Sequence, residues 1–158
     1  GTRAGDIDGG AVTFIEKKLG LDADGMSNLL NKKSGVAGLT GGSSDMRDVE
    51  NAAKEGNPRA QLAQDMYFYR IKKYIGAYAA AMGGLDVIVF TAGVGENQIG
   101  MRSEVCKDME FLGVKFDEQK NQVRGEEAII SADDSRVKVV VIPTDEELMI
   151  ATDTMNLL

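Results

Sequence analysis

The sequence predicts an α/β domain, and three features of the chain support that prediction. Two short runs of strand-favouring residues, at 87–90 and 137–142, show no polar alternation, which is typical of strands covered on both faces, as in parallel sheets. Each run is followed by a turn and then by apolar residues at helical spacing. The 158 residues are one ordinary domain in length and can bury a sizeable core.

The composition disfavours several classes of function. The formal net charge is −7 and no run of Lys or Arg exceeds a pair, so no nucleic-acid partner is expected. No apolar segment has signal or membrane length, so no membrane partner is expected either. The single cysteine, Cys106, is expected to be inert and, with these features, fits a cytoplasmic protein. Histidine is absent, which removes the Ser-His and Cys-His nucleophiles and the usual catalytic zinc sites.

The first forty-eight residues alternate glycine-rich loops with short helices. Residues 1–10 contain four glycines and predict a loop, in which Arg3 alone suggests only a solvated cation. Helical spacing follows at 12–19, with Gly20 as the stop, and again around 26–30. A second glycine-rich loop at 34–48 enters a helix, and Ser43 or Ser44 is expected to cap it.

Two residues at the end of that second loop have two interpretations. Asp45 in a first helical turn is favoured by the helix dipole, which is a purely structural role. Alternatively Asp45 accepts a hydrogen bond from a ribose or base while Arg47 contacts phosphate, because a guanidinium fork suits phosphate oxygens.

A long helix is predicted from Asn57-Pro58 to the glycine pair at 83–84. Phe68, Ile71, Ile75, Ala79 and Met82 recur along it at three- and four-residue steps, and Tyr67, Tyr74 and Tyr78 widen the apolar face. Such a stripe usually packs into a core, and it can also form a partner surface.

The stretch 86–97 holds the strongest chemical signal. Its strand ends abruptly, and Gly93 and Gly95 allow a tight turn before helical spacing resumes at Met101. Strand, glycine turn and helix together can bind a nucleotide, because the glycines let a ligand approach the backbone and the helix presents unpaired N–H groups. The alternative is that the two glycines only make a tight connection.

The last third of the chain predicts a second strand-turn-helix unit. Residues 111–122 suggest a hairpin or surface excursion, 128–130 a short strand, and 137–142 a strand that pairs with the one at 87. Thr144 and Glu147 form a capping box opening a helix with Leu148, Ala151, Thr152 and Met155 on one face. Asp145 and Glu146 are then either first-turn acids or, at the carboxyl end of a parallel strand, oxygen ligands of Mg²⁺ on a nucleotide.

Five segments together resemble one family. They are Gly-Thr-Arg-Ala-Gly-Asp-Ile-Asp at 1–8, Ser-Ser-Asp-Met-Arg-Asp at 43–48, Val-Phe-Thr-Ala-Gly-Val-Gly-Glu-Asn at 89–97, Glu-Phe-Leu-Gly at 110–113 and Val-Ile-Pro-Thr-Asp-Glu-Glu-Leu at 141–148. In this order they resemble the acetate kinase family, within the actin-like superfamily that includes sugar kinases and heat-shock ATPases. The resemblance covers essentially the whole chain.

The resemblance implies a ribonuclease-H-like (actin-like ATPase) domain with a mostly parallel sheet flanked by helices. On this basis 1–158 is a nucleotide-binding domain, with a helical insertion at about 10–84 and strand-loop-helix units at 85–109 and 136–158. The implied reaction is reversible transfer of the γ-phosphoryl group of ATP to acetate with Mg²⁺, giving acetyl phosphate and ADP.

The resemblance also implies roles for individual residues. Arg3 matches an arginine that stabilises the transferring phosphoryl group, and Glu146 matches an acid associated with Mg²⁺. Asp45, Met46 and Arg47 match an ATP-contacting segment, and the loop beside the adenosine is matched by Gly93, Val94, Gly95, Glu96 and Asn97.

The chain departs from the family in its length. It begins Gly-Thr-Arg without Met and is much shorter than an acetate kinase, so we expect a piece of a longer protein, the C-terminal portion, that is inactive alone. The resemblance further implies a homodimer and an acetate pocket mostly outside this chain. A propionate or butyrate kinase fragment and a non-catalytic dimerisation module are the alternatives.

Overall fold

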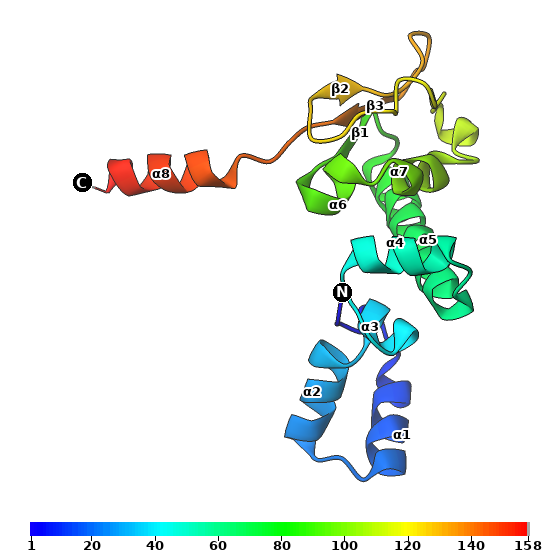
Figure 1. Cartoon of the computed structure of the whole chain (residues 1–158), viewed down its shortest axis with the longest axis vertical. Helices are drawn as coiled ribbons and strands as arrows, with labels where there is room; N and C mark the ends of the chain where they lie inside the picture. The colour runs from blue at the N-terminus through cyan, green and yellow to red at the C-terminus, as the bar shows by residue number, and fades with distance from the viewer. Residues whose placement is uncertain (158) are drawn as a thin grey trace. The chain divides into compact units, whose positions relative to one another are not determined.

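The computed structural model describes residues 1–157, and the chain divides into two compact units, Gly1–Arg70 and Ile71–Leu158. Figure 1 labels the elements in chain order. The first unit is helical, with α1 (Gly9–Leu19), α2 (Ala23–Lys32), α3 (Gly35–Thr40) and α4 (Met46–Lys54), and it contains the start of α5 (Pro58–Met82).

The first two helices follow the sequence prediction because their ends carry strong signals. The Asp8 carboxylate accepts a hydrogen bond from Ala11 N and caps α1, and the Asp22 carboxylate caps α2 through Gly25 N. Gly20 ends α1 in the left-handed conformation, with φ of 63°. The two helices therefore form a hairpin over 9–32, visible at the blue end of the chain in Figure 1.

The predicted loop at 34–48 is partly wrong, because α3 lies inside it. The predicted cap is also wrong: Asp45 is the N-cap of α4, and its carboxylate accepts from Arg47 N at 2.9 Å. The Ser43 hydroxyl instead accepts from Asp45 N at 3.0 Å and donates to the Asp48 carboxylate at 2.7 Å. A serine two residues before the cap thus supports the turn rather than the helix end.

Helix α5 has the predicted ends. The Asn57 side chain accepts from Arg59 N and Ala60 N, Pro58 is the first helical residue, and Gly83 and Gly84 follow the helix at positive φ. Its apolar stripe is core only in part, because Ala79 is buried while Met82 is 68% exposed. The predicted face of α5 is therefore partly buried and partly surface, with Tyr74 and Tyr78 exposed beside Met82.

The second unit holds a three-stranded sheet in the order β1-β3-β2. Strand β1 (Val87–Phe90) pairs in parallel with β3 (Lys138–Val141), and β2 (Ala128–Ile129) pairs antiparallel with β3. The remaining elements are α6 (Ala92–Asn97), α7 (Ile99–Cys106), the 3-10 helix η1 (Glu110–Leu112) and α8 (Glu146–Asn156). The predicted α/β class and the parallel pairing are confirmed, and the sheet is small and mixed.

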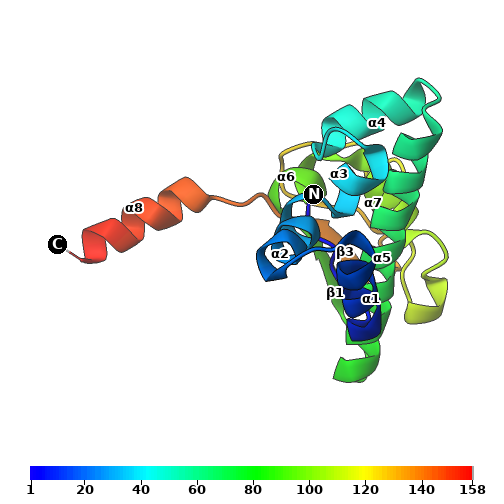
Figure 2. The same ribbon diagram turned by 90° about the horizontal axis from the view of Figure 1, so that it is seen from below.

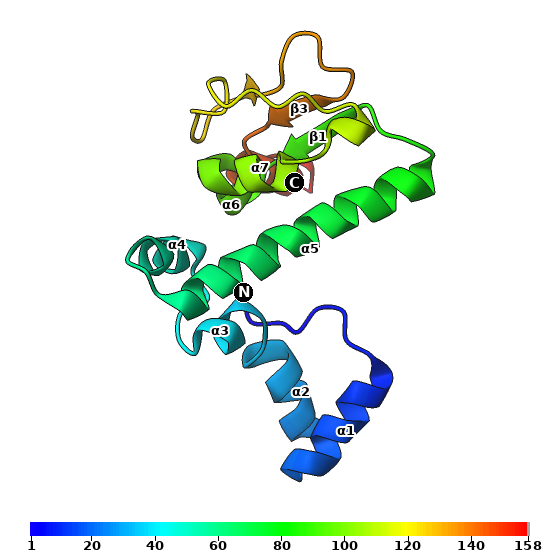
Figure 3. The same ribbon diagram turned by 90° about the vertical axis from the view of Figure 1, so that its right-hand side faces the viewer.

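The prediction that both long strands are covered on both faces is wrong. Ile88 and Phe90 are buried, whereas Val87 and Val89 are 48% and 49% exposed. Figures 1 and 3 show α7 along one face of the sheet, and its Met101 and Val105 are buried. The strands thus bury alternate side chains against one helical layer.

Cys106, at the end of α7, is buried and forms no disulfide. Burial raises the pKa of its thiol to about 12, with a smaller opposing effect from Lys72. The thiol therefore stays protonated at neutral pH, in keeping with the expected inert role.

The predicted capping box at Thr144 is wrong as well. Asp145 is the N-cap of α8, and its carboxylate accepts from Leu148 N at 3.0 Å. An extended segment joins β3 to α8, as Figures 1 and 2 show, and the apolar residues of α8 are exposed. Across 1–157, no helix is both long and apolar enough to span a membrane.

Candidate functional site

A pocket of about 400 Å³ lies where the parallel strands β1 and β3 end. The β1–α6 turn and the β3–α8 turn form its walls, and its lining residues are Ala92, Gly93, Glu96, Thr144, Asp145, Glu146 and Glu147. The carboxyl edge of parallel strands is where open α/β sheets bind their ligands. The pocket brings together three predicted site residues, Gly93, Glu96 and Glu146.

The turn after β1 differs from the predicted glycine loop, since Gly93 and Gly95 lie inside the short helix α6. The chain turns at Thr91 and Ala92 instead. Ala92 has φ of 58°, a left-handed conformation that side chains other than glycine rarely adopt, and its N–H donates to the Thr144 hydroxyl at 3.1 Å. The turn is held in this conformation by a residue from the other wall of the pocket.

The two glycines of α6 have different reasons to lack a side chain. A Cβ on Gly95 would lie 3.1 Å from the carbonyl carbon of Phe90, so this glycine allows α6 to pack closely on the end of β1. A Cβ on Gly93 would meet no atom within 4 Å, and Gly93 lines the pocket. Packing therefore explains the missing side chain of Gly95, whereas a Cβ on Gly93 would be tolerated by the described residues.

The other predicted members of α6 are engaged in local contacts. The Asn97 side chain donates to the Gly93 carbonyl at 3.0 Å, and Val94 is half-buried. The Glu96 carboxylate accepts from Thr144 N at 2.8 Å, so it ties α6 to the β3–α8 turn.

The sequence prediction missed Arg102 of α7, whose side chain is completely buried. Its guanidinium donates to the carbonyls of Gly95 (2.8 Å) and Glu96 (2.9 Å) at the end of α6. It also donates to the Asn121 side chain (2.7 Å), the Asn121 carbonyl (3.0 Å) and the Val123 carbonyl (2.7 Å). Desolvation, and then repulsion from Arg124, lowers the pKa of Arg102.

Arg102 thus holds α6 in place without a carboxylate partner among residues 1–157. Its carbonyl acceptors have no signature in the sequence. The available signal is a lone arginine between the apolar residues Met101 and Val105, with no acid three or four positions away to pair with it on the helix surface.

The acidic wall of the pocket can supply only part of a metal site. Glu146 lies in the first turn of α8 with an exposed side chain, and the Asp145 carboxylate is used as the cap. The described residues contain no group of three or more acidic or sulfur ligands able to hold a metal ion. This donor set fits Mg²⁺ that takes most of its ligands from phosphate and water.

In the first unit, Asp45 and Arg47 form a two-pronged ion pair. Arg47 Nη2 lies 2.6 Å from Asp45 Oδ2, and Arg47 Nε donates to Asp45 Oδ1 at 3.1 Å. Hydrogen bonds from the Arg47 side chain and backbone lower the pKa of Asp45 to about 2. Met46, between them, is buried, so its side chain belongs to the core.

We expect Arg47→Ala to raise the pKa of Asp45 part of the way back to its ordinary value of 3.8. The backbone bond from residue 47 remains, so the return is incomplete. Because the folded pKa lies below that of the unfolded chain, the stabilisation is present above 3.8 and is lost as the pH falls through 2. An NMR titration of the Asp45 carboxyl carbon measures this.

Lys54→Ala is the control for that titration, because Lys54 is a cation of the same helix that pairs with Glu50. It should leave the Asp45 titration unchanged. An Asp45 midpoint that is the same in Arg47→Ala and in the unmodified chain would contradict the assigned cause.

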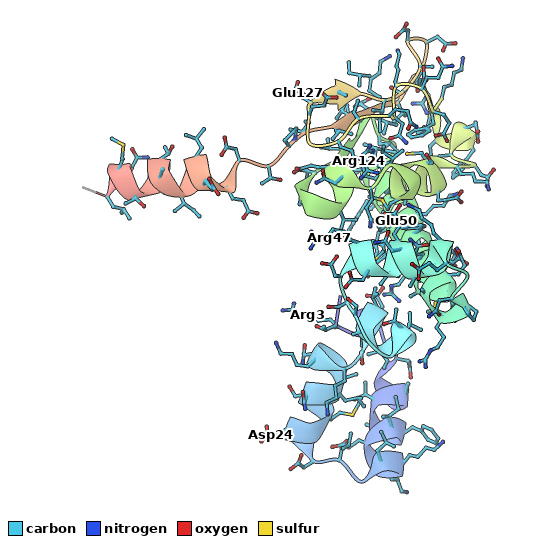
Figure 4. The ribbon with its side chains drawn as sticks, viewed as in Figure 1. Arg3, Asp24, Arg47, Glu50, Arg124 and Glu127 are labelled. Carbon is cyan, nitrogen blue, oxygen red and sulfur yellow. The ribbon has the colours of Figure 1, made fainter. Side chains whose placement is uncertain are left out.

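Arg3 has an exposed side chain on a backbone that is held firmly. Around it, Ala4 N donates to the Leu30 carbonyl at 2.8 Å, and the Thr2 and Gly1 carbonyls accept from Ser34 N (3.0 Å) and Ala37 N (2.9 Å). Figure 4 shows the labelled Arg3 side chain standing clear of the ribbon. Residues 1–4 of the predicted loop are thus ordered, and we call them the strap; the side chain of Arg3 extends from it into solvent.

Gly35 makes this strap possible. It has φ of 60°, and a Cβ there would lie 2.7 Å from the Arg3 carbonyl oxygen. We expect Gly35→Ala to destabilise the first unit by about 1–3 kcal/mol, through backbone strain and this clash. Urea unfolding followed by circular dichroism measures the loss.

Gly42→Ala is the matched control, because Gly42 has no positive φ and a Cβ there would meet nothing within 4 Å. Its unfolding midpoint should stay within the error of the unmodified chain. Equal midpoints for the two variants would show that Gly35 does not constrain the strap.

Solved structures with the same fold define the class of protein to which this chain belongs. The fold matches the crystal structure of Porphyromonas gingivalis acetate kinase with a TM-score of 0.93 and 60% identity, over 98% of this chain and 39% of that one. A propionate kinase from Francisella tularensis subsp. tularensis SCHU S4 matches with a TM-score of 0.85 and 37% identity, over 95% and 38%. The architecture is that of the actin-like ATPases.

The family follows from the sequence. The Acetokinase family model matches residues 1–152, and the chain belongs to that family. An acetate kinase of Phocaeicola vulgatus is 72% identical over 158 residues, which are 100% of this chain and 40% of that protein. The chain therefore spans about 40% of the length of its curated relatives. These matches establish the family, and they do not support the narrower expectation of a C-terminal portion.

Proposed function

We propose that the protein containing this chain transfers the γ-phosphoryl group of ATP reversibly to acetate, giving acetyl phosphate and ADP. The observation that carries the proposal is the pocket at the ends of β1 and β3, which joins Gly93 to Glu146 in a chain 72% identical to an acetate kinase. The same pocket lies at the edge of the sheet where this class of fold binds ligands.

In this proposal the pocket holds the nucleotide. The open backbone at Gly93 faces the adenosine side, with Val94, Gly95, Glu96 and Asn97 forming the rest of that segment. At the opposite wall, Glu146 either ligates Mg²⁺ directly or accepts a hydrogen bond from a water bound to that ion. When bound, Mg²⁺ neutralises charge on the phosphate oxygens.

Two cations of the first unit have proposed roles of their own. Arg3, presented by its strap, stabilises the negative charge on the transferring phosphoryl group. Arg47 keeps Nη1 outside its contacts with Asp45, so it can contact ATP while Asp45 orients the guanidinium.

The experiment is an acetyl phosphate assay on the natural full-length protein with Arg3→Ala and Arg3→Lys variants. An arginine in this role is worth about 10³–10⁵ in rate, and lysine should restore little because it lacks the planar fork. Lys33→Ala, an exposed cation of the first unit, is the control and should keep full activity. Full activity in Arg3→Ala would contradict the role, and the chain 1–158 alone should be inactive.

A second candidate is a kinase for a longer carboxylate, favoured by the likeness to the Francisella propionate kinase. We propose that the acyl pocket lies mostly outside this chain. Comparing acetate, propionate and butyrate as acceptors at fixed ATP decides between them, and acetate should give the highest kcat/KM.

We further propose that the protein is a homodimer in the cytoplasm. A cytoplasmic setting suits the single buried, unpaired thiol. Helix α5 keeps Tyr69, Tyr78 and Met82 exposed, a set of large side chains of the kind enriched at interfaces. Sedimentation equilibrium of the full-length protein should give a dimer, and Tyr78→Glu should weaken it. A monomer at every concentration would contradict this part, and dimerisation without phosphoryl transfer would favour a non-catalytic module.

A further inference from the structure

The two walls of the pocket are joined by three hydrogen bonds that all involve Thr144. Thr144 N donates to the Glu96 carboxylate at 2.8 Å, and the Thr144 hydroxyl accepts from Ala92 N at 3.1 Å. The Thr144 and Thr91 hydroxyls lie 2.8 Å apart and share a further hydrogen bond. We propose that Thr144 and Glu96 form a clamp that positions the two walls of the pocket relative to each other.

The chemistry of the clamp makes its parts depend on one another. Ala92 has the strained left-handed conformation, and the hydrogen bond described for its N–H goes to the Thr144 hydroxyl. The Thr144 backbone that carries this hydroxyl is itself held by the carboxylate of Glu96. A bond to an ionised acceptor is stronger than one between neutral groups, so Glu96 is the anchor.

The clamp connects the two residues that matter for the ligand. Glu96 follows Gly93 by one helical turn in α6, and Thr144 precedes Glu146 by two residues. Fixing Thr144 against Glu96 therefore fixes the backbone that carries Gly93 and the backbone that carries Glu146. Resting on the proposed function, this gives Glu96 and Thr144 a positioning role for Mg-ATP.

Amide hydrogen exchange in the ligand-free chain tests the clamp, because a change at Glu96 should alter the exchange rate of the Ala92 amide. Glu96→Ala does not remove a partner of Ala92 N, yet it should raise the exchange rate of the Ala92 amide about tenfold, the effect of losing one net hydrogen bond. Thr144→Val should do the same, and Thr144→Ser should restore the slow exchange. Thr152→Val in α8 is the control and should leave the Ala92 amide unchanged.

Titration with Mg-ATP then tests the positioning role. Glu96→Ala and Thr144→Val should each weaken binding about tenfold, and Thr144→Ser should bind like the unmodified chain. If the exchange rate of the Ala92 amide were the same in Glu96→Ala as in the unmodified chain, the clamp would be wrong and the proposed function would be unaffected. Faster exchange with unchanged Mg-ATP affinity would overturn the positioning role. An unmodified chain that does not bind Mg-ATP would instead contradict the nucleotide part of the proposed function, and the positioning role with it.

Discussion

Replacing Arg102 by methionine should lower the free energy of unfolding by about 3–5 kcal/mol, because several buried acceptors lose their donor and each unsatisfied group costs about 1–3 kcal/mol. The guanidinium makes five hydrogen bonds within a fully buried environment. Methionine fills similar space but leaves the carbonyls of Gly95, Glu96, Asn121 and Val123 without this donor. Urea unfolding followed by circular dichroism measures the loss as a lower midpoint.

Two further variants separate the geometry of Arg102 from its charge. Arg102→Lys keeps the charge but has a single ammonium in place of the fork, so it should recover only a minor part of the loss. Arg124→Met removes an exposed arginine that donates to the Asn97 carbonyl at 2.6 Å, and it should cost less than about 1 kcal/mol. Equal midpoints for Arg102→Met and Arg124→Met would contradict the role given to Arg102.

The second large effect is expected at Gly93. Gly93→Val places a branched side chain in the pocket, where a clash with a bound nucleotide should cost about 1–3 kcal/mol and weaken binding roughly 10- to 100-fold. The stability of the chain should change little, because a Cβ there meets nothing within 4 Å. Calorimetric titration with Mg-ATP and thermal unfolding measure the two quantities.

Gly95→Ala should show the opposite pattern. Its Cβ would be 3.1 Å from the Phe90 carbonyl carbon, so α6 has to shift and the melting temperature should fall. If Gly93→Val lowered the melting temperature as much as Gly95→Ala and left the affinity unchanged, the separation between packing and ligand roles would be wrong.

Local signals predicted the elements whose ends depend on neighbouring residues. Asn57-Pro58 and the glycine pair at 83–84 delimit α5, and the two β-branched runs give β1 and β3 in parallel. From that pairing alone, Gly93 and Glu146 are expected at the same edge of the sheet, and the pocket contains both. Local capping chemistry and strand propensity suffice for this part of the fold.

Features that depend on distant partners were not predictable. A run of four apolar residues does not reveal that only one face of β1 is covered, because the coverage depends on the packing of α7. Thr144 has the spacing of a capping residue, but its hydroxyl forms hydrogen bonds with the Thr91 hydroxyl and with Ala92 N. Residues 92–97 form the helix α6 despite two glycines. The carbonyls of Gly95 and Glu96 at the end of α6 accept hydrogen bonds from Arg102, which belongs to the next helix.

The most direct test of the account maps Mg-ATP onto the chain by NMR. In a titration of the ¹⁵N-labelled chain, we expect the amides of 91–97 and 144–147 to shift most and to saturate together. Glu146→Gln should reduce the shifts on the acidic side of the pocket. A folded chain whose amides do not respond, or respond only away from these two turns, would contradict the claim that the carboxyl ends of β1 and β3 form the nucleotide site.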